Sequence, residues 1–247
     1  MKRSSYQGVL NIIRFNPHFF VTALFVGIVL ISLLLILPSN YSMICCLCLF
    51  VLIYSMVVSL AVSHWIYDRS NIYKLPWIKP TSLDQESVWL NINAGFDEIT
   101  QTLKNSFPDV SLRTMDFYEP LKHTEPSIAR ARKIYPPTEE TEQIAYQSLP
   151  VRDASVDRII AMFSLHEIRD SSERIAMLSE FHRVLAQGGE IYITEHLLDR
   201  SNLAAYSLGA FHFHSKKEWL SNIEESNLVV KRKVKTTHFV TTFILTK

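Results

Sequence analysis

The sequence predicts an α/β protein: one domain with a parallel sheet, preceded by a hairpin of two membrane-spanning helices. Two observations lead to this prediction. Residues 149–195 alternate between strand-like apolar runs and one amphipathic helical run, and a helix that connects two buried strands implies a parallel sheet. Residues 15–67 contain no acidic or basic side chain other than two histidines, which is typical of membrane spans.

The charge balance excludes one class of partner. The chain has 25 Lys and Arg against 24 Asp and Glu, a formal net charge of +1 at pH 7. A nucleic-acid-binding domain would show a clearly basic surface. We therefore expect no nucleic acid partner, and we expect the residues after the hairpin to form one globular domain of ordinary size.

The hairpin is predicted from two apolar runs. Residues 19–37 and 43–62 each approach the ~20 residues that cross a hydrocarbon core of ~30 Å. The turn-forming cluster 38–42 separates them. A cleaved signal peptide is the alternative for the first run. That run is longer than the ~7–15 apolar residues of a signal peptide, and a second span follows at once, so we expect two true spans.

Basic residues predict how the hairpin is oriented. The loop between the spans carries no charge, whereas basic residues flank the hairpin on both sides: Lys2, Arg3, Arg14, Arg69, Lys74 and Lys79. The positive-inside rule then places both ends, and the globular domain, on the cytoplasmic side of a cell inner or cytoplasmic membrane. Aromatic residues after the second span fit a belt at the membrane interface: Trp65, Tyr67, Tyr73 and Trp77.

No metal site is expected. The cysteines Cys45, Cys46 and Cys48 lie inside the second span, and their spacing does not match a zinc site. His212 and His214 lack a neighbouring carboxylate or thiol in the sequence, which makes them poor ligands.

The remaining elements follow in order along the chain. The predicted alternation is strand 87–93, helix 96–107, strand 110–117, helix 127–135, strand 141–148, strand 156–163, helix 174–186, a strand from 190, and a closing pair of strands at 229–234 and 239–246. The pair Gly188-Gly189 is expected to end the helix before it. The domain division is 1–18 as a cytoplasmic N-terminal segment, 19–63 as the hairpin, 64–86 as an interfacial segment and linker, and 87–247 as the globular domain.

A run of short motifs in this domain resembles a known family. The motifs are Leu149-Pro150, Val156-Asp157, Ser164-Leu165-His166-Glu167 and Glu180-x-x-Arg183-Val184-Leu185-x-x-Gly188-Gly189. They resemble the second half of class I S-adenosylmethionine-dependent methyltransferases, nearest to the small-molecule and quinone type. The resemblance extends from residue 89 to the C-terminus. It implies a Rossmann-like methyltransferase sheet with helices on both faces, and S-adenosyl-L-methionine as the cofactor.

The resemblance also implies a cofactor turn after the first strand. Placed on the family's D-x-G-x-G-x-G loop, Asn91 takes the acidic position, Asn93 the first glycine, Gly95 the second and Asp97 the third, with the small residue Ala94 between. Only Gly95 matches literally. Asparagine tolerates the turn conformation, and Asp97 is expected to hold the ammonium group of the cofactor. The alternative is that Asp97 only caps a helix, in a domain that no longer binds the cofactor.

Three further residues complete the predicted cofactor site. Asp116 ends the second strand, where nucleotide-binding folds place a carboxylate on the ribose hydroxyls, although any exposed aspartate can end a strand. Gln147 is assigned to the adenine amino group, with Tyr146 as a stacking partner, and ordinary strand packing is the alternative for both. Ser164 follows the fourth strand at the same edge.

The candidate catalytic residues are His166, Glu167 and His196. An imidazole can take a proton from a phenol or hydroxyl as the methyl group is transferred, and His166 is the preferred base. Its alternative is a structural histidine. Glu167 orients it or caps a helix, and His196, next to Glu195, is the rival base. Four residues of the segment before the last helix are expected to line a substrate pocket, and core packing is the alternative for them: Tyr206, Phe211, His212 and His214.

The sequence therefore predicts a membrane-anchored S-adenosylmethionine-dependent methyltransferase, an enzyme that acts on a hydrophobic small molecule of phenolic, quinone-like or lipid-tailed type. A hairpin that holds the domain at the bilayer brings it to such substrates. The alternative is a catalytically inactive, membrane-tethered interaction module with the same fold. A dinucleotide oxidoreductase is less favoured, because the turn lacks the required glycines.

Overall fold

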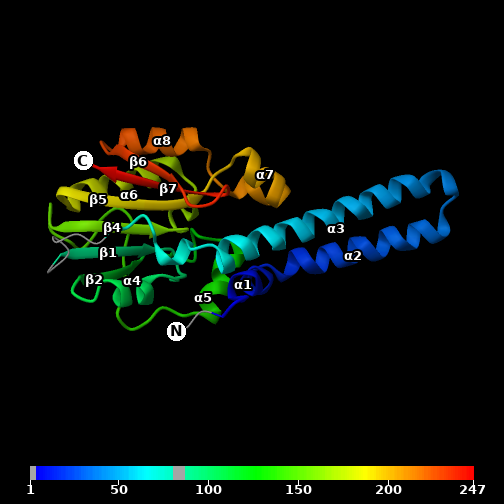
Figure 1. Cartoon of the computed structure of the whole chain (residues 1–247), viewed down its shortest axis with the longest axis horizontal. Helices are drawn as coiled ribbons and strands as arrows, with labels where there is room; N and C mark the ends of the chain where they lie inside the picture. Colours follow the sequence, from blue (N-terminus) through cyan, green and yellow to red (C-terminus); the bar gives the residue numbers. More distant parts are fainter. Residues whose placement is uncertain (1–3, 80–86) are drawn as a thin grey trace.

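The computed structural model describes residues 4–79 and 87–247. Its centre is a seven-stranded sheet in the order β3-β2-β1-β4-β5-β7-β6 (Figure 1). The strands are β1 (Val88–Asn93), β2 (Ser111–Asp116), β3 (Thr141–Gln143), β4 (Val156–Met162), β5 (Leu185–His196), β6 (Val229–Lys235) and β7 (Val240–Thr246). Neighbouring strands from β1 to β5 run parallel, and β7 is antiparallel to both of its neighbours. The predicted α/β fold with a parallel sheet is confirmed.

Apolar side chains on both faces explain why the central strands form. Most of β1 and β4 is buried, as expected for parallel strands that are covered on both faces. The closing pair of strands is confirmed as well, but β7 lies inside the sheet and is almost entirely buried, so that β6 is the edge strand. All five parallel strands end at one edge of the sheet, and ligands of open α/β sheets bind at this edge.

One face of the sheet is covered by α6 (Ser171–Val184) and α8 (Lys216–Glu225). Met177, Phe181 and Trp219 are buried there, in a cluster that continues to the side chains of β4 and β5. The helix α6 begins after Asp170, whose Oδ1 accepts from the N–H groups of Ser172 and Glu173 at 2.8 and 3.1 Å.

Several boundaries differ from prediction. The helix α6 ends at Val184, and the glycine pair lies inside β5, with Gly188 at φ +80°. The helix α4 (Thr100–Ser106) begins later than predicted because Asp97 Oδ1 accepts from the N–H groups of residues 99 and 100, both at 3.1 Å. The strand β3 stops at Gln143, since residues 145–148 form a turn closed by an isolated bridge.

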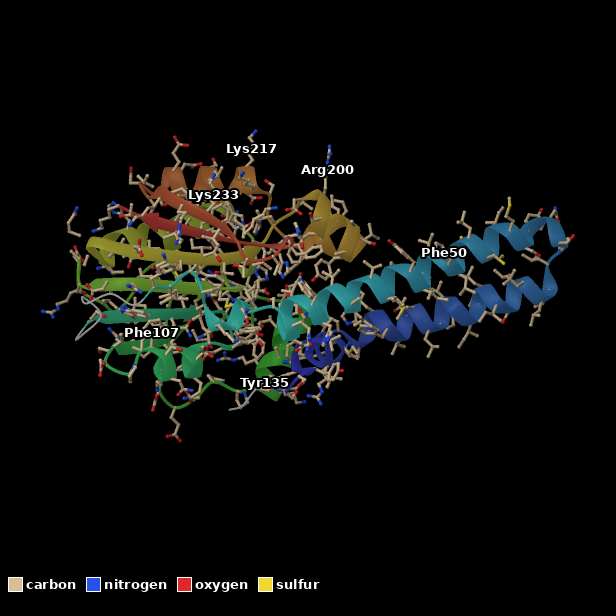
Figure 2. The ribbon with its side chains drawn as sticks, in the orientation of Figure 1. Phe50, Phe107, Tyr135, Arg200, Lys217 and Lys233 are labelled. Carbon is tan, nitrogen blue, oxygen red and sulfur yellow. The ribbon has the colours of Figure 1, made fainter. Side chains whose placement is uncertain are left out.

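The two apolar runs form a helical hairpin that projects from the domain (Figure 1). Its helices are α2 (Pro17–Ile36) and α3 (Ser42–His64), and the shorter α1 (Gln7–Phe15) precedes them beside α5 (Pro126–Ile134). Side chains point outward along both long helices (Figure 2), and Phe50 is 64% exposed. Both are long and apolar enough to cross a membrane, which makes them candidate spans by length and composition.

Residues 65–78, expected as an interfacial linker, contribute to the core of the domain. They follow α3 through one π turn, Trp65–Arg69, and cover the second face of the sheet together with α4. Five of their apolar side chains are at most 5% exposed: Ile66, Ile72, Leu75, Trp77 and Ile78. An interfacial position is therefore wrong for Trp77, whereas Trp65, 58% exposed, is accessible at the end of α3.

Hydrogen bonds to the carboxylate of Asp68 fix α1 against the end of α3. Its two carboxylate oxygens accept from the backbone N–H groups of Gly8 at 2.6 Å and Val9 at 3.0 Å, in the first turn of α1. A Cβ on Gly8 would lie 2.3 Å from the Cβ of Tyr67, so that only glycine permits this close approach. The hairpin, α1 and the domain thus share one packed junction.

The buried junction leads to a stability prediction. Ile72→Ala removes a side chain with 0% exposure, and we expect it to lower the free energy of unfolding by about 2–5 kcal/mol because it leaves a cavity between the junction and the sheet. Denaturant unfolding of the full chain in detergent, followed by circular dichroism, measures this. Leu121→Ala, at a residue that is 88% exposed, is the control and should change the value by no more than about 0.5 kcal/mol. Equal stability of the two variants would contradict the packing of residues 65–78.

Candidate functional site

The carboxyl edge of the parallel strands faces the end of the hairpin that adjoins the domain (Figure 1). A hydrogen bond joins the two: Tyr67 Oη lies 2.7 Å from Nε2 of His196, the last residue of β5. The predicted site residues Asn93, Asp116, Ser164 and His166 all lie at or just beyond strand ends on this edge. The sheet therefore gathers the candidate site next to the candidate membrane spans.

The turn after β1 forms as predicted. Asn93 Oδ1 accepts from the N–H of Gly95 at 3.2 Å, and its Nδ2 donates to the carbonyl oxygen of Met115 at 3.1 Å. Gly95 has φ +89°, in the left-handed region that glycine adopts at low cost. A Cβ there would also lie 3.0 Å from the ring of Tyr118. The asparagine at the first glycine position thus stabilises the bend.

Asn91 and Asp97 are bonded to each other. Asn91 Nδ2 donates to Asp97 Oδ1 at 2.9 Å and to Thr100 Oγ1 at 2.8 Å. The same Asp97 oxygen caps α4, as described above. These contacts agree with the alternative in which Asp97 is a helix cap, and its contact with the ammonium group of a cofactor stays a prediction.

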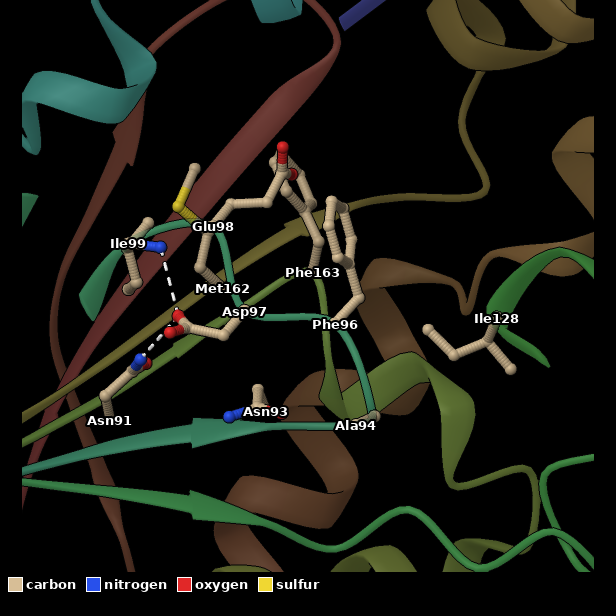
Figure 3. A pocket seen from close by; sticks show the side chains of 10 residues that line it. All are labelled: Asn91, Asn93, Ala94, Phe96, Asp97, Glu98, Ile99, Ile128, Met162 and Phe163. Atoms are coloured by element: carbon tan, nitrogen blue, oxygen red, sulfur yellow. Dashed lines mark hydrogen bonds between the residues drawn. The ribbon is translucent and has the colours of Figure 1, made fainter. Parts of the chain in front are cut away.

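A cavity of about 40 Å³ lies beside this turn (Figure 3). It is lined by Asn91, Asn93, Ala94, Phe96, Asp97, Glu98, Ile99, Ile128, Met162 and Phe163. A water molecule needs roughly 10–15 Å³ of such space, so the cavity has room for a few water molecules beside the turn.

Aromatic side chains pack against Phe96, which lines the cavity, from the α1 side. The ring centroid of Phe96 lies 5.3 Å from Phe15 of α1 and 5.3 Å from the ring of Tyr135, which follows α5. Tyr135 Oη also donates to Asn11 Oδ1 at 2.9 Å. The helix that precedes the hairpin therefore packs directly over the candidate cofactor turn.

Asp116, the predicted ribose ligand, is fully buried and already bonded within the chain. Its Oδ2 accepts from Arg132 Nη1 in a short ion pair and from Gln143 Nε2 at 2.9 Å, and its Oδ1 accepts from the N–H of Tyr118 at 2.9 Å. Sequence reasoning missed Arg132 and Gln143; the register that pairs Asp116 with Gln143 brings the latter into reach. The ribose role of Asp116 stays a prediction, and it requires that Arg132, whose side chain is 23% exposed, move away.

The remaining predicted cofactor residues lie apart from the turn or serve the fold. Gln147 is exposed in the turn after β3, and Tyr146 is bonded to Lys122 Nζ at 2.7 Å and to Glu173. Ser164 Oγ donates to the carbonyl oxygen of Ile92 at 3.0 Å and ties the ends of β1 and β4 together. Recognition of adenine by Gln147 stays a prediction.

His166 lies between two carboxylates. Its Nδ1 is 2.7 Å from Glu195 Oε2, and its Nε2 is 3.4 Å from Glu167 Oε1. Burial lowers the pKa of His166, but Glu195 and Glu167 outweigh it and raise the pKa to about 10. The imidazole therefore carries a proton at pH 7. A role as general base, which stays a prediction, requires that this proton leave first.

His196 is bonded through both ring nitrogens. Its Nε2 accepts from the hydroxyl of Tyr67, and its Nδ1–H reaches Asn202 Oδ1 at 3.2 Å and the carbonyl oxygen of Phe239 at 3.1 Å. Burial lowers the pKa of His196 to about 4, so the ring is neutral at pH 7. It also stacks on Phe163 and Phe213. These contacts favour a structural role at the junction over the predicted catalytic one.

The segment before α8 brings one more histidine to the site. His212, at the end of the short helix η6 (Ser207–His212), has its Nε2 3.9 Å from Glu167 Oε1 and its Nδ1 3.5 Å from Glu125 Oε1. The expectation that it lacks a neighbouring carboxylate is wrong, because that expectation considered only residues close in sequence. Burial lowers the pKa of His212 to about 4, which leaves this ring neutral.

The other residues expected to line a substrate pocket divide between packing and surface. His214 bonds Glu218 Oε1 at 2.9 Å and Arg174 Nη1 at 2.9 Å, inside a buried network. Tyr206 packs edge-on against His196, and Phe211 is 61% exposed.

Residues 91–193 match the family model described as "Methyltransferase domain", which covers less than half of the chain. No curated protein matches the sequence. Among solved structures, an O-methyltransferase family 2 protein from Planctomyces limnophilus in complex with apigenin has 17% identity and a TM-score of 0.50, with 78% of this chain and 61% of that chain covered. A SAM-dependent methyltransferase from Aquifex aeolicus has 15% identity and a TM-score of 0.50, with 73% and 94% covered.

At these identities the two structures show the fold alone. The chain spans about three fifths of the length of the Planctomyces protein and nearly all of the Aquifex protein. The family match supports a methyltransferase domain of the S-adenosylmethionine-dependent class, and it indicates S-adenosylmethionine as the cofactor. The matched residues begin in β1 and end in β5, and they therefore include the cofactor turn, Asp116 and His166.

The ion pair at Asp116 leads to a prediction, because Arg132 and the ribose of the cofactor would compete for the same carboxylate. Arg132→Met frees the carboxylate, and we expect it to tighten binding of S-adenosylhomocysteine roughly tenfold, about the strength of one hydrogen bond to a charged group. Isothermal titration of the full chain in detergent measures the affinity. Lys133→Met removes an exposed charge from the same helix and should leave the affinity unchanged. Weaker binding by Arg132→Met would mean that Arg132 contacts the cofactor itself.

Proposed function

We propose that this protein is a membrane-anchored S-adenosylmethionine-dependent methyltransferase that acts on a hydrophobic small molecule of phenolic, quinone-like or lipid-tailed type. One observation carries the proposal: the carboxyl edge of the methyltransferase-like sheet is bonded to the junction with the apolar hairpin through Tyr67 and His196. An enzyme held in this way would meet substrates that partition into the bilayer. The basic flanks Arg14 and Arg69 support a cytoplasmic position for the domain, in an inner or cytoplasmic membrane.

Exposed apolar side chains beside the hairpin support a lipophilic substrate. The helix α7 (Arg200–Tyr206) packs against α3, and the segment from α7 through η6 carries Leu203, Leu208 and Phe211 at 37%, 82% and 61% exposure. We call these three residues the apolar patch. The same segment ends in His212 at the candidate site. A molecule leaving the bilayer would therefore contact the patch on its way to the strand ends.

The chain's own groups suit an acceptor oxygen that develops negative charge. The cofactor, when bound, supplies an already activated methyl group, so that the protein mainly aligns the reactants and excludes water. His166, held in its charged form by Glu195, places a positive charge at the carboxyl edge. A phenol has an ordinary pKa of ~10, and a neighbouring cation makes its ionisation easier. This charge would favour the phenolate that attacks the methyl group.

Binding measurements test the cofactor role. We expect the full chain in detergent to bind S-adenosylmethionine and S-adenosylhomocysteine, and Asp116→Asn to weaken both by tenfold or more because the ribose hydroxyls lose a charged acceptor. Asp109→Asn, at an exposed position before β2, is the matched control. A folded chain that binds neither compound would favour the inactive interaction module, in which the Arg132–Asp116 pair permanently closes the site.

The apolar patch predicts a change in substrate preference. In Leu208→Ser/Phe211→Ser we expect KM for a lipid-tailed phenol in vesicles to rise about tenfold or more, since two apolar contacts of about 1–3 kcal/mol each are lost. KM for a short, water-soluble phenol should stay the same. Val229→Ser, 57% exposed at the opposite edge of the sheet, controls for lost surface hydrophobicity. An equal rise in KM for both substrates would mean that the apolar patch does not guide lipid-tailed substrates into the site.

A further inference from the structure

We propose that His166, Glu167 and His212 bind one divalent transition-metal ion, of the zinc type, beside the candidate active site. One potential ligand atom from each of these residues lies within 4.8 Å of the other two. The site does not require methyl transfer, but the role inferred for it below rests on the proposed function. The argument for the site comes from its geometry, from the groups behind each ligand and from one carboxylate oxygen that lacks a partner.

The three side chains are close to the spacing of ligands around a metal ion. His166 Nε2 lies 3.4 Å from Glu167 Oε1, and His212 Nε2 lies 3.9 Å from the same oxygen. Two ligand atoms bound at ~2.0–2.2 Å with tetrahedral geometry are roughly 3.3–3.6 Å apart. A shift of a few tenths of an ångström in His212 would bring its Nε2 to that distance from Glu167. The two histidine ligand atoms lie within 4.8 Å of each other and would have to approach by up to roughly 1.5 Å. Its side chain is 27% exposed and has room to move.

Each imidazole has a carboxylate behind it. Glu195 Oε2 is 2.7 Å from Nδ1 of His166, and Glu125 Oε1 is 3.5 Å from Nδ1 of His212. Histidines that bind metals almost always donate the N–H of the other ring nitrogen to such a group, which fixes the ring and increases its basicity. In both rings this arrangement leaves Nε2 directed toward Glu167. Metal binding at His166 requires that the ring lose its extra proton, and both rings then present a free Nε2 to Glu167.

Glu167 supplies an independent observation. Its residue is 6% exposed, and its Oε2 is buried without a hydrogen-bond partner. An unsatisfied carboxylate oxygen in the interior is costly unless a cation or donor reaches it. Three carboxylates, Glu125, Glu167 and Glu195, surround the two imidazoles, and a divalent cation would balance part of their charge.

The network behind the cluster holds its parts in place. Arg174 of α6 is fully buried and bonds both His214 and the α8 residue Glu218. It thereby connects the two helices to the segment that carries His212. The exposed Arg169 donates to the carbonyl oxygen of His212. These two guanidinium groups therefore bond the backbone or other side chains, and neither lies between the three proposed ligands His166, Glu167 and His212. The loop that carries His212 is thus anchored on both sides.

The donor set indicates the kind of metal and its use. Two imidazoles and one carboxylate suit zinc and other imidazole-binding divalent ions rather than magnesium or calcium. Three protein ligands leave at least one coordination position for another oxygen. At this edge of the sheet that oxygen would belong to the substrate, and the metal would lower the pKa of its hydroxyl group. The substrate class would then be a phenol or enol that binds through its oxygen.

The test is metal binding by the full chain in detergent, after treatment with a chelator. Co²⁺ is titrated and followed by its visible absorption, which reports nitrogen and oxygen ligation, and bound Zn²⁺ is counted by elemental analysis. We expect one equivalent per chain. Glu167→Gln and His212→Gln should weaken binding by 100-fold or more, and Glu195→Gln, which acts through His166, by about 10–100-fold. His238→Gln, at an exposed histidine in the loop between β6 and β7, should bind as the parent does.

Each outcome of this test supports or rejects the proposed metal site. Stoichiometric binding that is lost in the Glu167 and His212 variants, while circular dichroism shows that they are folded, supports the site. A second measurement covers a variant that fails to fold: Zn²⁺ should raise the thermal midpoint of the parent and of His238→Gln. No binding by the parent, or equal binding by all variants, overturns the proposal. Metal binding without binding of S-adenosylmethionine keeps the site and rejects the proposed methyl transfer.

Discussion

The junction between the hairpin and the sheet is the constraint on which the rest of this structure depends. Residues 65–78 bury five large apolar side chains against one face of the sheet, so that without them part of this apolar face would be exposed to solvent. Tyr67 then reaches His196 at the carboxyl edge, and Asp68 holds α1 over the cofactor turn. Because burial of this size is comparable to the net stability of a domain, the candidate spans and the candidate site form one unit.

Local pattern in the sequence was enough to predict the sheet and most of its strands. Continuous apolar runs specify buried parallel strands such as β1 and β4, and the parallel direction follows from the crossover helices. The boundaries that were wrong depend on single hydrogen bonds, for example those that Asp97 makes to the start of α4. The role of residues 65–78 was missed because aromatic and aliphatic residues after a span have the same composition whether they meet lipid or a sheet.

The candidate site was predictable only where its residues follow strands directly. His166, Glu167 and Asp116 were found in this way. Arg132 and Gln143 were missed, because they come from other elements and reach Asp116 through tertiary packing. His212 was expected only as a pocket-lining residue, and the carboxylates beside it were missed for the same reason. Asp116 shows the consequence. The sequence indicates a carboxylate at the ribose position, but the fold decides that an arginine neutralises it, and a fully buried carboxylate is unfavourable without such a partner.

The same reasoning applies to Glu195, which is also fully buried. Its carboxylate accepts from the backbone N–H of His166 at 3.3 Å and bonds the ring of that residue at 2.7 Å, so that the orientation of the imidazole is fixed from behind. With Nδ1 held there, Nε2 points toward Glu167, and a cation that satisfies Glu167 would lie between the ring and that carboxylate. A proton on His166 is one such cation, and a metal ion is another. In the proposed methyl transfer, either would place positive charge near an acceptor oxygen that becomes negative, and Glu195 is the residue that holds the His166 ring in position for it.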